Sequence, residues 1–436
     1  MKHITLIPAN LHLQVYVFSF ACYLSMVMAG ISMTWPSPLT AWYSSKDSEV
    51  PMTEHEVSWM VSIVAIGAGF ASIPCGMLAD IFGRKTILLG TGITSALSWL
   101  LIMVTRSKWA LFVAQILGGI VLGGAPSVAP IYISEISPPH IRGAIVGQLN
   151  TMFFVGQLLV YAVGPQLSYT NYIRACASVP VLFFIFFGFA PESPYYLLSK
   201  GREEEAKDCM TKLRGKDSLG ELEASKQEHL EKDSMDKLSI WEMLKTNNYM
   251  KNMICLQILS SVNQLNGSAT ISLYTMEFLG GKWVAIEMGF ITVVSSFFGS
   301  MLSDPFGRRP VLMVSQVGCA VSTILLFFHF HFMDLRNSKL FLYFGVFGFS
   351  FISSGMSFIM LALPSELFGT SLRAFVNGLT QTVDAIACFI ALKIFFTVNI
   401  TLGIETNFII YTLVSFSGLI AAMFIPETAR QRISQG

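Results

Sequence analysis

Long apolar stretches alternate with short polar ones along almost all of the 436 residues. Each apolar stretch is close to the ~20 residues that cross a bilayer as an α-helix. Twelve stretches can be marked, at residues 13–33, 57–79, 87–104, 110–132, 144–165, 172–190, 250–275, 283–303, 311–332, 340–363, 376–396 and 403–425. The pattern predicts an all-α membrane protein with twelve transmembrane helices.

An even number of crossings places both ends of the chain on the same side of the membrane. The short loops on one side carry a modest excess of Lys and Arg, and the longest polar segment, residues 191–249, lies on that side. Because cytosolic loops are enriched in these residues, we expect both termini and this segment in the cytosol. Within the segment, Pro194 and Gly201 predict the start and end of a short helix, and Gly215 predicts the end of a second.

Charged motifs occur twice, in the same order and at nearly the same spacing. The pairs are Asp80-x-x-Gly83-Arg84-Lys85 with Asp304-x-x-Gly307-Arg308-Arg309, Glu135 and Arg142 with Glu366 and Arg373, and Pro191-Glu192 with Pro426-Glu427. The repetition predicts two six-helix bundles, residues 1–190 and 250–436, joined by a cytosolic helical segment at 191–249. In transporters built from such repeats the substrate binds near the membrane midplane, between the bundles.

Composition excludes several classes of function. Apolar residues make up 53% of the chain and charged residues 13%, about half the charged share of a soluble domain, so the lipid bilayer is an expected partner. A net charge of +1 argues against binding to nucleic acid. The seven cysteines are scattered without metal-ligand spacing, and no catalytic triad or phosphate-binding loop is visible. We therefore expect neither an enzyme nor a cofactor or metal.

At these motifs the sequence resembles the sugar porter family of the major facilitator superfamily. Further motifs of that family are Pro130-x-Tyr132-x-x-Glu135-x-x-Pro138, Pro191-Glu192-Ser193-Pro194 and Glu366-Leu367-Phe368. The stretch from Thr34 to Pro38 most resembles the insect branch of facilitated trehalose transporters. The resemblance implies a major facilitator fold and passive transport of a sugar, trehalose or a hexose, by alternating access. It also leads us to expect a monomer in the plasma membrane.

The repeated charges predict a gate at the cytosolic rim. Gly83 and Gly307 fit tight turns that a side chain would block. We expect ion pairs that form across the two bundles when the cytosolic side is closed and separate when it opens. The alternative is that these charges only set the membrane topology. The proposed gating residues are Asp80, Arg84, Glu135, Arg142, Glu192, Asp304, Arg308, Glu366, Arg373 and Glu427.

Polar residues inside the apolar stretches are candidates for sugar contacts, because such residues face a cavity rather than lipid. In the seventh stretch, Gln257, Gln264 and their neighbours recur at three- or four-residue spacing, and Gly267 would loosen the helix. The family's Gln-Gln-x-x-Gly-x-Asn motif, which binds sugar hydroxyls, falls here at 263–269, with Ala269 in place of its Asn. The candidate substrate contacts are Gln264, Asn150, Asn263, Asn266, Gln257, Thr292, Gln381 and Asp384.

Asp384 leaves alternatives open. A carboxylate near the middle of a span lines water or has a partner. It is an acceptor for sugar hydroxyls, a protonatable group of a proton-coupled symporter, or a neutral acid held by neighbouring hydroxyls. The family's Gly-Pro-x-Pro-Trp segment is also replaced, at 357–361. That change motivates a second reading, a sugar sensor or regulator without net transport. Asn399-Ile-Thr401 is a candidate glycosylation site in a predicted outer loop.

Overall fold

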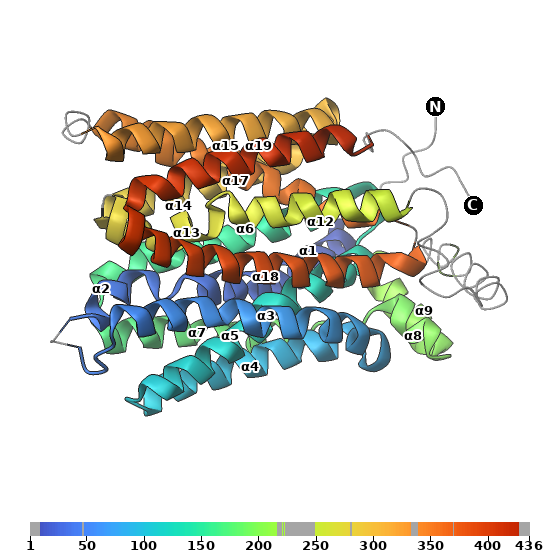
Figure 1. Ribbon diagram of the computed structural model, residues 1–436. Helices are drawn as coiled ribbons and strands as arrows, with labels where there is room; N and C mark the ends of the chain where they lie inside the picture. Colours follow the sequence, from blue (N-terminus) through green and yellow to red (C-terminus); the bar gives the residue numbers. More distant parts are fainter. Residues whose placement is uncertain are drawn as a thin grey trace.

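A computed structural model describes residues 9–45, 48–215, 220, 222, 249–279, 281–332, 339–368 and 370–426. Over these residues the regular elements are helices, and the long ones lie side by side with roughly parallel axes (Figure 1). The short helices α8 (Pro194–Ser199) and α9 (Glu203–Arg214) lie at one end of this bundle, and α2 (Thr40–Tyr43) lies at the other (Figure 1). We call these the α9 end and the α2 end.

The long helices fall into two sequential halves. The N-terminal half contains α1 (Ala9–Thr34), α3 (Glu54–Phe82), α4 (Arg84–Val104), α5 (Lys108–Ile136), α6 (Pro139–Val163) and α7 (Tyr169–Phe187). The C-terminal half contains α12 (Tyr249–Leu265), α13 (Ser268–Tyr274), α14 (Gly281–Phe306), α15 (Arg308–His331), α17 (Lys339–Leu367), α18 (Thr370–Leu402) and α19 (Ile404–Phe424). Single turns η1 (Ser37–Leu39), η2 (Gly164–Gln166) and η4 (Thr275–Leu279) complete the described elements.

Eleven helices in the described residues are each long and apolar enough to cross a membrane. The seventh predicted crossing is α12 followed by α13, which are separated at Gly267, so the two pieces together make the twelfth. Several helices extend beyond the predicted apolar stretches, because their terminal turns are polar. For example, α3 begins at Glu54 with a capping box, in which Thr53 and Glu56 each bond the other's backbone N–H.

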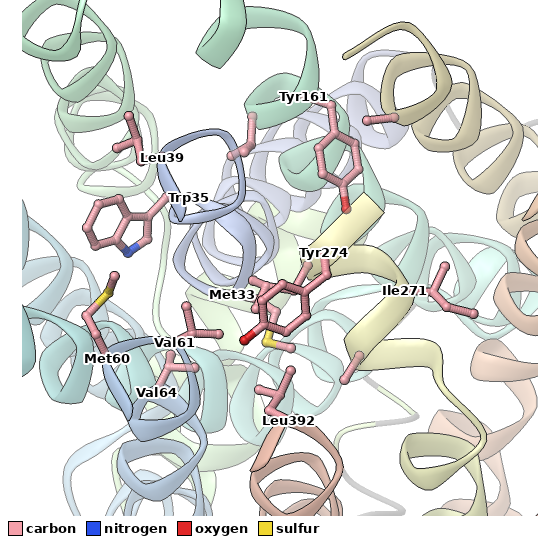
Figure 2. Packing of buried hydrophobic residues seen from close by; sticks show 14 of the residues in the cluster. Met33, Trp35, Leu39, Met60, Val61, Val64, Tyr161, Ile271, Tyr274 and Leu392 are labelled. Carbon is pink, nitrogen blue, oxygen red and sulfur yellow. The ribbon is translucent and has the colours of Figure 1, made fainter. Parts of the chain in front are cut away.

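Among the described residues, the hydrophobic core is shared between the halves at one end only. At the α2 end, a joint core includes Trp35 and Tyr161 from the N-terminal half together with Tyr274 and Leu392 from the C-terminal half. Figure 2 shows Tyr274 beside Leu392 and close to Met33. At the α9 end the N-terminal half and the C-terminal half have separate cores. The protein is therefore closed at the α2 end, and its halves are less tightly joined at the α9 end.

Glycines bring α5 and α3 into close contact. A Cβ atom at Gly119 would lie 2.2 Å from the carbonyl oxygen of Val64, and one at Gly123 would lie 2.2 Å from that of Ala68. Neither separation is physically possible, so only glycine permits this packing. This close contact fixes the wall from which Gly123 borders the central cavity.

Helices α8 and α9 are attached to the N-terminal half. The Tyr196 hydroxyl donates to the carbonyl of Ile81 over 3.0 Å. The guanidinium of Arg214, a residue only 5% exposed, donates to the carbonyls of Glu135 and Ile136 over 2.6 and 3.0 Å. As predicted, Pro194 begins α8, while Gly201 and Gly215 follow the two helices with φ of +74° and +87°. Residues 216–219, 221 and 223–248 lie outside the described residues.

Candidate functional site

A cavity of about 170 Å³ lies between the two halves. Helices α1, α3, α5 and α6 line it from the N-terminal half, and α12, α13, α17 and α18 line it from the C-terminal half. Its polar lining consists of Asn150, Gln157, Asn263, Gln264, Ser268, Ser272, Ser357, Gln381 and Asp384. Methionines and phenylalanines, including Phe153 and Phe154, supply much of the remaining wall. Amides and hydroxyls both donate and accept hydrogen bonds, which suits a ligand rich in hydroxyls.

The break between α12 and α13 shapes the C-terminal wall of the cavity. Gly267 has φ of +101°, in the left-handed region, and a Cβ there would lie 2.7 Å from the ring of Tyr411. Asn263 and Gln264 precede the break and Ser268 follows it, and all three line the cavity. Broken helices next to a midplane site are a recurring feature of transporters. The loosening predicted at Gly267 is confirmed.

Asp384 of α18 reaches the cavity and is held by α12. Its Oδ1 accepts a hydrogen bond from the Ser260 hydroxyl over 2.5 Å, and Gln264 of α12 lines the cavity together with it. Gln381 lines the cavity one turn before Asp384 on α18. The polar face predicted for the eleventh crossing therefore does point into the space between the halves.

Asn150 of α6 lines the cavity and also joins the two halves. Its Nδ2 donates to the Ser296 hydroxyl of α14 over 3.3 Å. The hydroxyl of Thr151, one residue later, lies 3.2 Å from the same oxygen. Side chains from both halves thus meet at one wall of the cavity, where a relative movement of the halves would change its shape.

Three of the predicted contacts do not line this cavity. The Gln257 amide donates to the Thr380 hydroxyl over 3.0 Å, which ties α12 to α18. Asn266 is fully buried, and its Oδ1 accepts the backbone N–H of Ser268 over 3.1 Å at the start of α13. Thr292 borders a separate hollow of about 20 Å³ and donates to the carbonyl of Met288. These three side chains form hydrogen bonds within the protein and do not border the cavity.

Conversely, the prediction left out Gln157, Ser268, Ser272 and Ser357. Gln157 follows Asn150 by two helical turns, so the spacing along α6 was a usable signal. Ser272 similarly extends the pattern of Ser268 along α13. For Ser357 the signal was weak, because it lies in a serine-containing run of α17 where several positions look alike.

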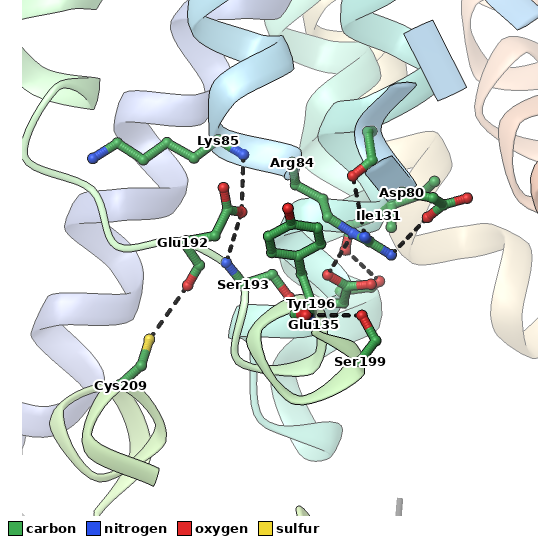
Figure 3. A network of polar contacts seen from close by, with 12 residues as sticks. Asp80, Arg84, Lys85, Ile131, Glu135, Glu192, Ser193, Tyr196, Ser199 and Cys209 are labelled. Atoms are coloured by element: carbon green, nitrogen blue, oxygen red, sulfur yellow. Dashed lines mark hydrogen bonds and ion pairs between the residues drawn. The ribbon is translucent and has the colours of Figure 1, made fainter. Parts of the chain in front are cut away.

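At the α9 end of the N-terminal half, a charged cluster surrounds Arg84 (Figure 3). Its guanidinium lies 2.9 Å from Asp80 Oδ1 and 3.1 Å from Glu135 Oε2, and it donates to the carbonyl of Ala79. Asp80 is half-exposed, whereas Arg84 and Glu135 are largely shielded from solvent. Arg84 therefore binds two carboxylates and the C-terminal end of α3, as expected for a cation at that position.

A second cluster occupies the matching place in the C-terminal half. Arg308 Nη2 lies 2.9 Å from Glu366 Oε1, and Arg308 Nε lies 3.1 and 3.3 Å from the two oxygens of Glu366. The side chain of Arg308 is only 9% exposed. A guanidinium that contacts both oxygens of a shielded carboxylate forms a strong, directional pair. The side chains of Asp304 and Arg373, and all of Glu427, lie outside the described residues.

Neither cluster pairs residues of different halves; the pairs expected across the halves belong to the state closed at the other end and stay a prediction. Arg84 with Glu135 and Arg308 with Glu366 each join elements of a single half. Two other expected partners are placed differently. Glu192 forms no ion pair with the described residues; its Oε1 accepts the backbone N–H groups of Lys85 and Ser193 over 3.0 and 2.9 Å. Arg142 likewise forms none there, and its Nη2 reaches only the carbonyl of Ser137, at 3.5 Å.

The predicted turns are present. Gly83 has φ of +103° and Gly307 has φ of +90°, and each separates two long helices. A Cβ at Gly83 would lie 2.3 Å from Glu192 Oε2, so the turn is closed tightly over that carboxylate. The glycosylation site is placed differently: Asn399 lies in the last turns of α18 rather than in a loop, because that helix continues to Leu402.

Comparisons with known proteins agree with this architecture. Residues 15–435 match the model of the sugar (and other) transporter family. The facilitated trehalose transporter Tret1 of Polypedilum vanderplanki is 24% identical over 98% of this chain and 88% of its own. The human solute carrier family 2, facilitated glucose transporter member 6, is 25% identical over 97% of this chain and 90% of its own.

Solved structures show the same fold. The partially occluded inward-open xylose transporter XylE of E. coli superposes with a TM-score of 0.79 at 19% identity, covering 95% of this chain and 98% of that one. The human organic anion transporter MFSD10 superposes with a TM-score of 0.67 at 13% identity, covering 94% and 99%. The major facilitator fold expected from the motifs is confirmed.

Proposed function

The chain belongs to the sugar (and other) transporter family, and from that premise we propose that it moves a hexose or a small oligosaccharide such as trehalose down its gradient. The observation that supports this proposal best is the cavity between the halves, lined by Gln264, Asn263, Asn150 and Gln381. Together with Gln157 these make five amides around one space, which supply donors and acceptors at fixed positions, as several sugar hydroxyls require.

Transport would proceed by alternating access. The joint core at the α2 end and the separate cores at the α9 end describe a state that is closed on one side. If the α9 end faces the cytosol, as the basic loops predict, this state faces inward. The reverse state would separate Tyr274 and Leu392 from Met33 and bring the two α9-end rims together.

The charged clusters fit a revised form of the gate. In the state closed at the α2 end, Arg84 and Arg308 bind carboxylates of their own halves. We propose that these pairs keep each rim intact while the rims are apart, and that exchange of partners between halves accompanies closure. Each such partly desolvated pair would bias the two states by about 1–3 kcal/mol.

The test is uptake of labelled glucose and trehalose into vesicles that contain the purified protein. We expect equilibration without accumulation, and we expect Gln264→Ala to reduce the rate at least tenfold. Gln257→Ala is the matched control from the same helix, because its amide bonds Thr380 outside the cavity. Absence of uptake, with binding retained, would favour a sensor. Accumulation driven by an imposed proton gradient would favour a symporter that uses Asp384.

A further inference from the structure

Asp384 is the one ionisable carboxyl group among the described residues that line the central cavity. Among the described residues that line it, the side chains are amides, hydroxyls, apolar groups and this one carboxylate, with no Lys, Arg or His. Described α1 residues from Gln14 to Thr34 contain no charged side chain either. No lining residue therefore supplies a cation to offset the charge of Asp384 when it is ionised.

Nearby cations are engaged elsewhere. Lys393 follows Asp384 by nine residues on α18, and Lys251 precedes Ser260 by nine on α12, each roughly 13 Å along a helix. The ammonium of Lys393 lies 3.8 Å from the centre of the Trp59 ring, and that of Lys251 lies 6.0 Å from the Phe424 ring. Neither lysine lines the cavity.

The Ser260 hydroxyl makes a short hydrogen bond to Asp384. The Ser260 hydroxyl has one proton, and its contact with Asp384 Oδ1 is 2.5 Å, against 3.5 Å to the carbonyl of Thr380. An O–H donor at that short distance is typical of a bond to a charged oxygen.

A second acceptor in the cavity has no partner. Asn263 is 7% exposed and lines the cavity, and its buried Oδ1 accepts no hydrogen bond from the described residues. A buried acceptor without a donor is costly, so a bound ligand that donates there would be favoured. The carboxylate and this amide oxygen both call for a ligand rich in donors.

We propose that the cavity prefers a hydroxyl-rich ligand that also carries a protonated amine, such as an amino sugar. An ammonium group has three donors, a positive charge and no acceptor, so it complements both Asp384 and Asn263 Oδ1. The remaining hydroxyls of the ligand would bond the amides of Gln264, Gln381 and Asn150. This inference rests on the proposed sugar transport and adds a charge preference to it.

The experiment compares three hexoses of similar shape at pH 7: glucosamine, which carries the amine, N-acetylglucosamine, in which the same nitrogen is neutral, and glucose. Each competes with labelled glucose for uptake into vesicles that contain the purified full chain. We expect glucosamine to compete about tenfold better than glucose or more, as for a hydrogen bond that gains charge. N-acetylglucosamine should show no such advantage.

Variants then locate the preference. Asp384→Asn keeps the shape of the side chain and removes its charge, so glucosamine should lose its advantage over glucose in the competition, whatever rate of uptake the variant retains. Gln381→Ala, from the same wall, should weaken both sugars alike and preserve their ratio. Size-exclusion chromatography checks that each variant is folded. Asp384→Glu keeps a carboxylate and should therefore keep the preference for glucosamine if the charge is responsible.

Two outcomes would overturn the inference in distinguishable ways. Glucose uptake with no advantage for glucosamine in the unmodified protein would refute the charge preference and leave sugar transport intact. An advantage for glucosamine that persists in Asp384→Asn would refute the assigned residue. Failure of all three sugars to bind or to be taken up would remove the proposed function and this inference with it.

Discussion

Gly267 is the residue on which the shape of the cavity wall most depends. Its φ of +101° disfavours any side chain, and a Cβ would lie 2.7 Å from the ring of Tyr411. We expect Gly267→Ala to destabilise the protein by about 1–3 kcal/mol and to lower the midpoint of thermal unfolding in detergent. The control is Gly90→Ala in α4, where nothing lies within 4 Å of the added atom. An equal midpoint for the two variants would contradict the strain assigned to Gly267.

Cys209 of α9 is predicted to be chemically inert at neutral pH. Burial raises the pKa of its thiol from 9.0 to about 11, and Sγ donates to the carbonyl of Glu192 over 3.3 Å. Because only the thiolate reacts with maleimides, labelling should be about a hundredfold slower at pH 7 than for an ordinary cysteine and should rise with pH until about 11. Mass spectrometry of the α9 peptide measures the rate.

As a control, labelling of Cys209 is measured in the same way after the protein has been unfolded. Rapid labelling of Cys209 in the folded protein at pH 7 would show that α9 detaches from the N-terminal half. The pKa shift also favours the folded state while the thiol is protonated. That contribution is complete below pH 9.0 and is lost as the pH rises from there towards about 11.

At the scale of elements, Arg214 fastens α9 to the end of α5. Its guanidinium donates to the carbonyls of Glu135 and Ile136, which have no partner within the helix. We expect Arg214→Ala to loosen α8 and α9 by about 1–3 kcal/mol, seen as faster hydrogen exchange there. Arg202→Ala is the control, because its pair with Glu205 is exposed and worth little. Equal exchange in both variants would contradict the fastening.

The elements themselves were largely predictable from the sequence. Length and apolarity located all twelve crossings, and the glycines at 83, 267 and 307 located two turns and one break. Spacing alone did not tell which polar residues line the cavity. Gln257 and Gln264 share one stripe of α12, but they are about 10 Å apart along the axis. Of the two, only Gln264 lines the cavity. Gln257 lies beside Thr380 of α18 and bonds its hydroxyl.

The sequence also did not predict which carboxylates pair with the arginines at the α9 end. The order of charges predicted that Arg84 and Arg308 would meet carboxylates, and they do. The pairing expected across the halves belongs to the state closed at the α9 end, and in the state closed at the α2 end the pairs lie within each half. Asn266, a predicted sugar contact, is kept from the cavity for a local reason. Directly before a helix break, an Asn side chain is well placed to accept a hydrogen bond from the backbone N–H of the next helix.

At the scale of the whole molecule, the interface of α3 with α18 holds the α2 end closed. The Lys393 ammonium of α18 lies over the Trp59 ring of α3 and 3.4 Å from the Ser58 hydroxyl, and Phe389 packs against the same ring. A cation over an aromatic face contributes about 0.5–2 kcal/mol, here between two halves that must separate when this end opens. Trp59→Leu should therefore shift the population several-fold towards the state open at the α2 end.

Spin labels on cysteines introduced at Ser107 and Lys282 measure this shift, because both positions are exposed at the α2 end and each belongs to a different half. The labels should be farther apart in the state open at the α2 end than in the state closed there. In Trp59→Leu, the population with the longer distance between the labels should increase. Trp109→Leu is the matched control, since that ring is 71% exposed and, among the described residues, its aromatic contact is with Phe112 of its own half. Equal distance distributions in both variants would mean that the joint core alone keeps the α2 end closed. The cation over Trp59 would then add nothing to the balance between states.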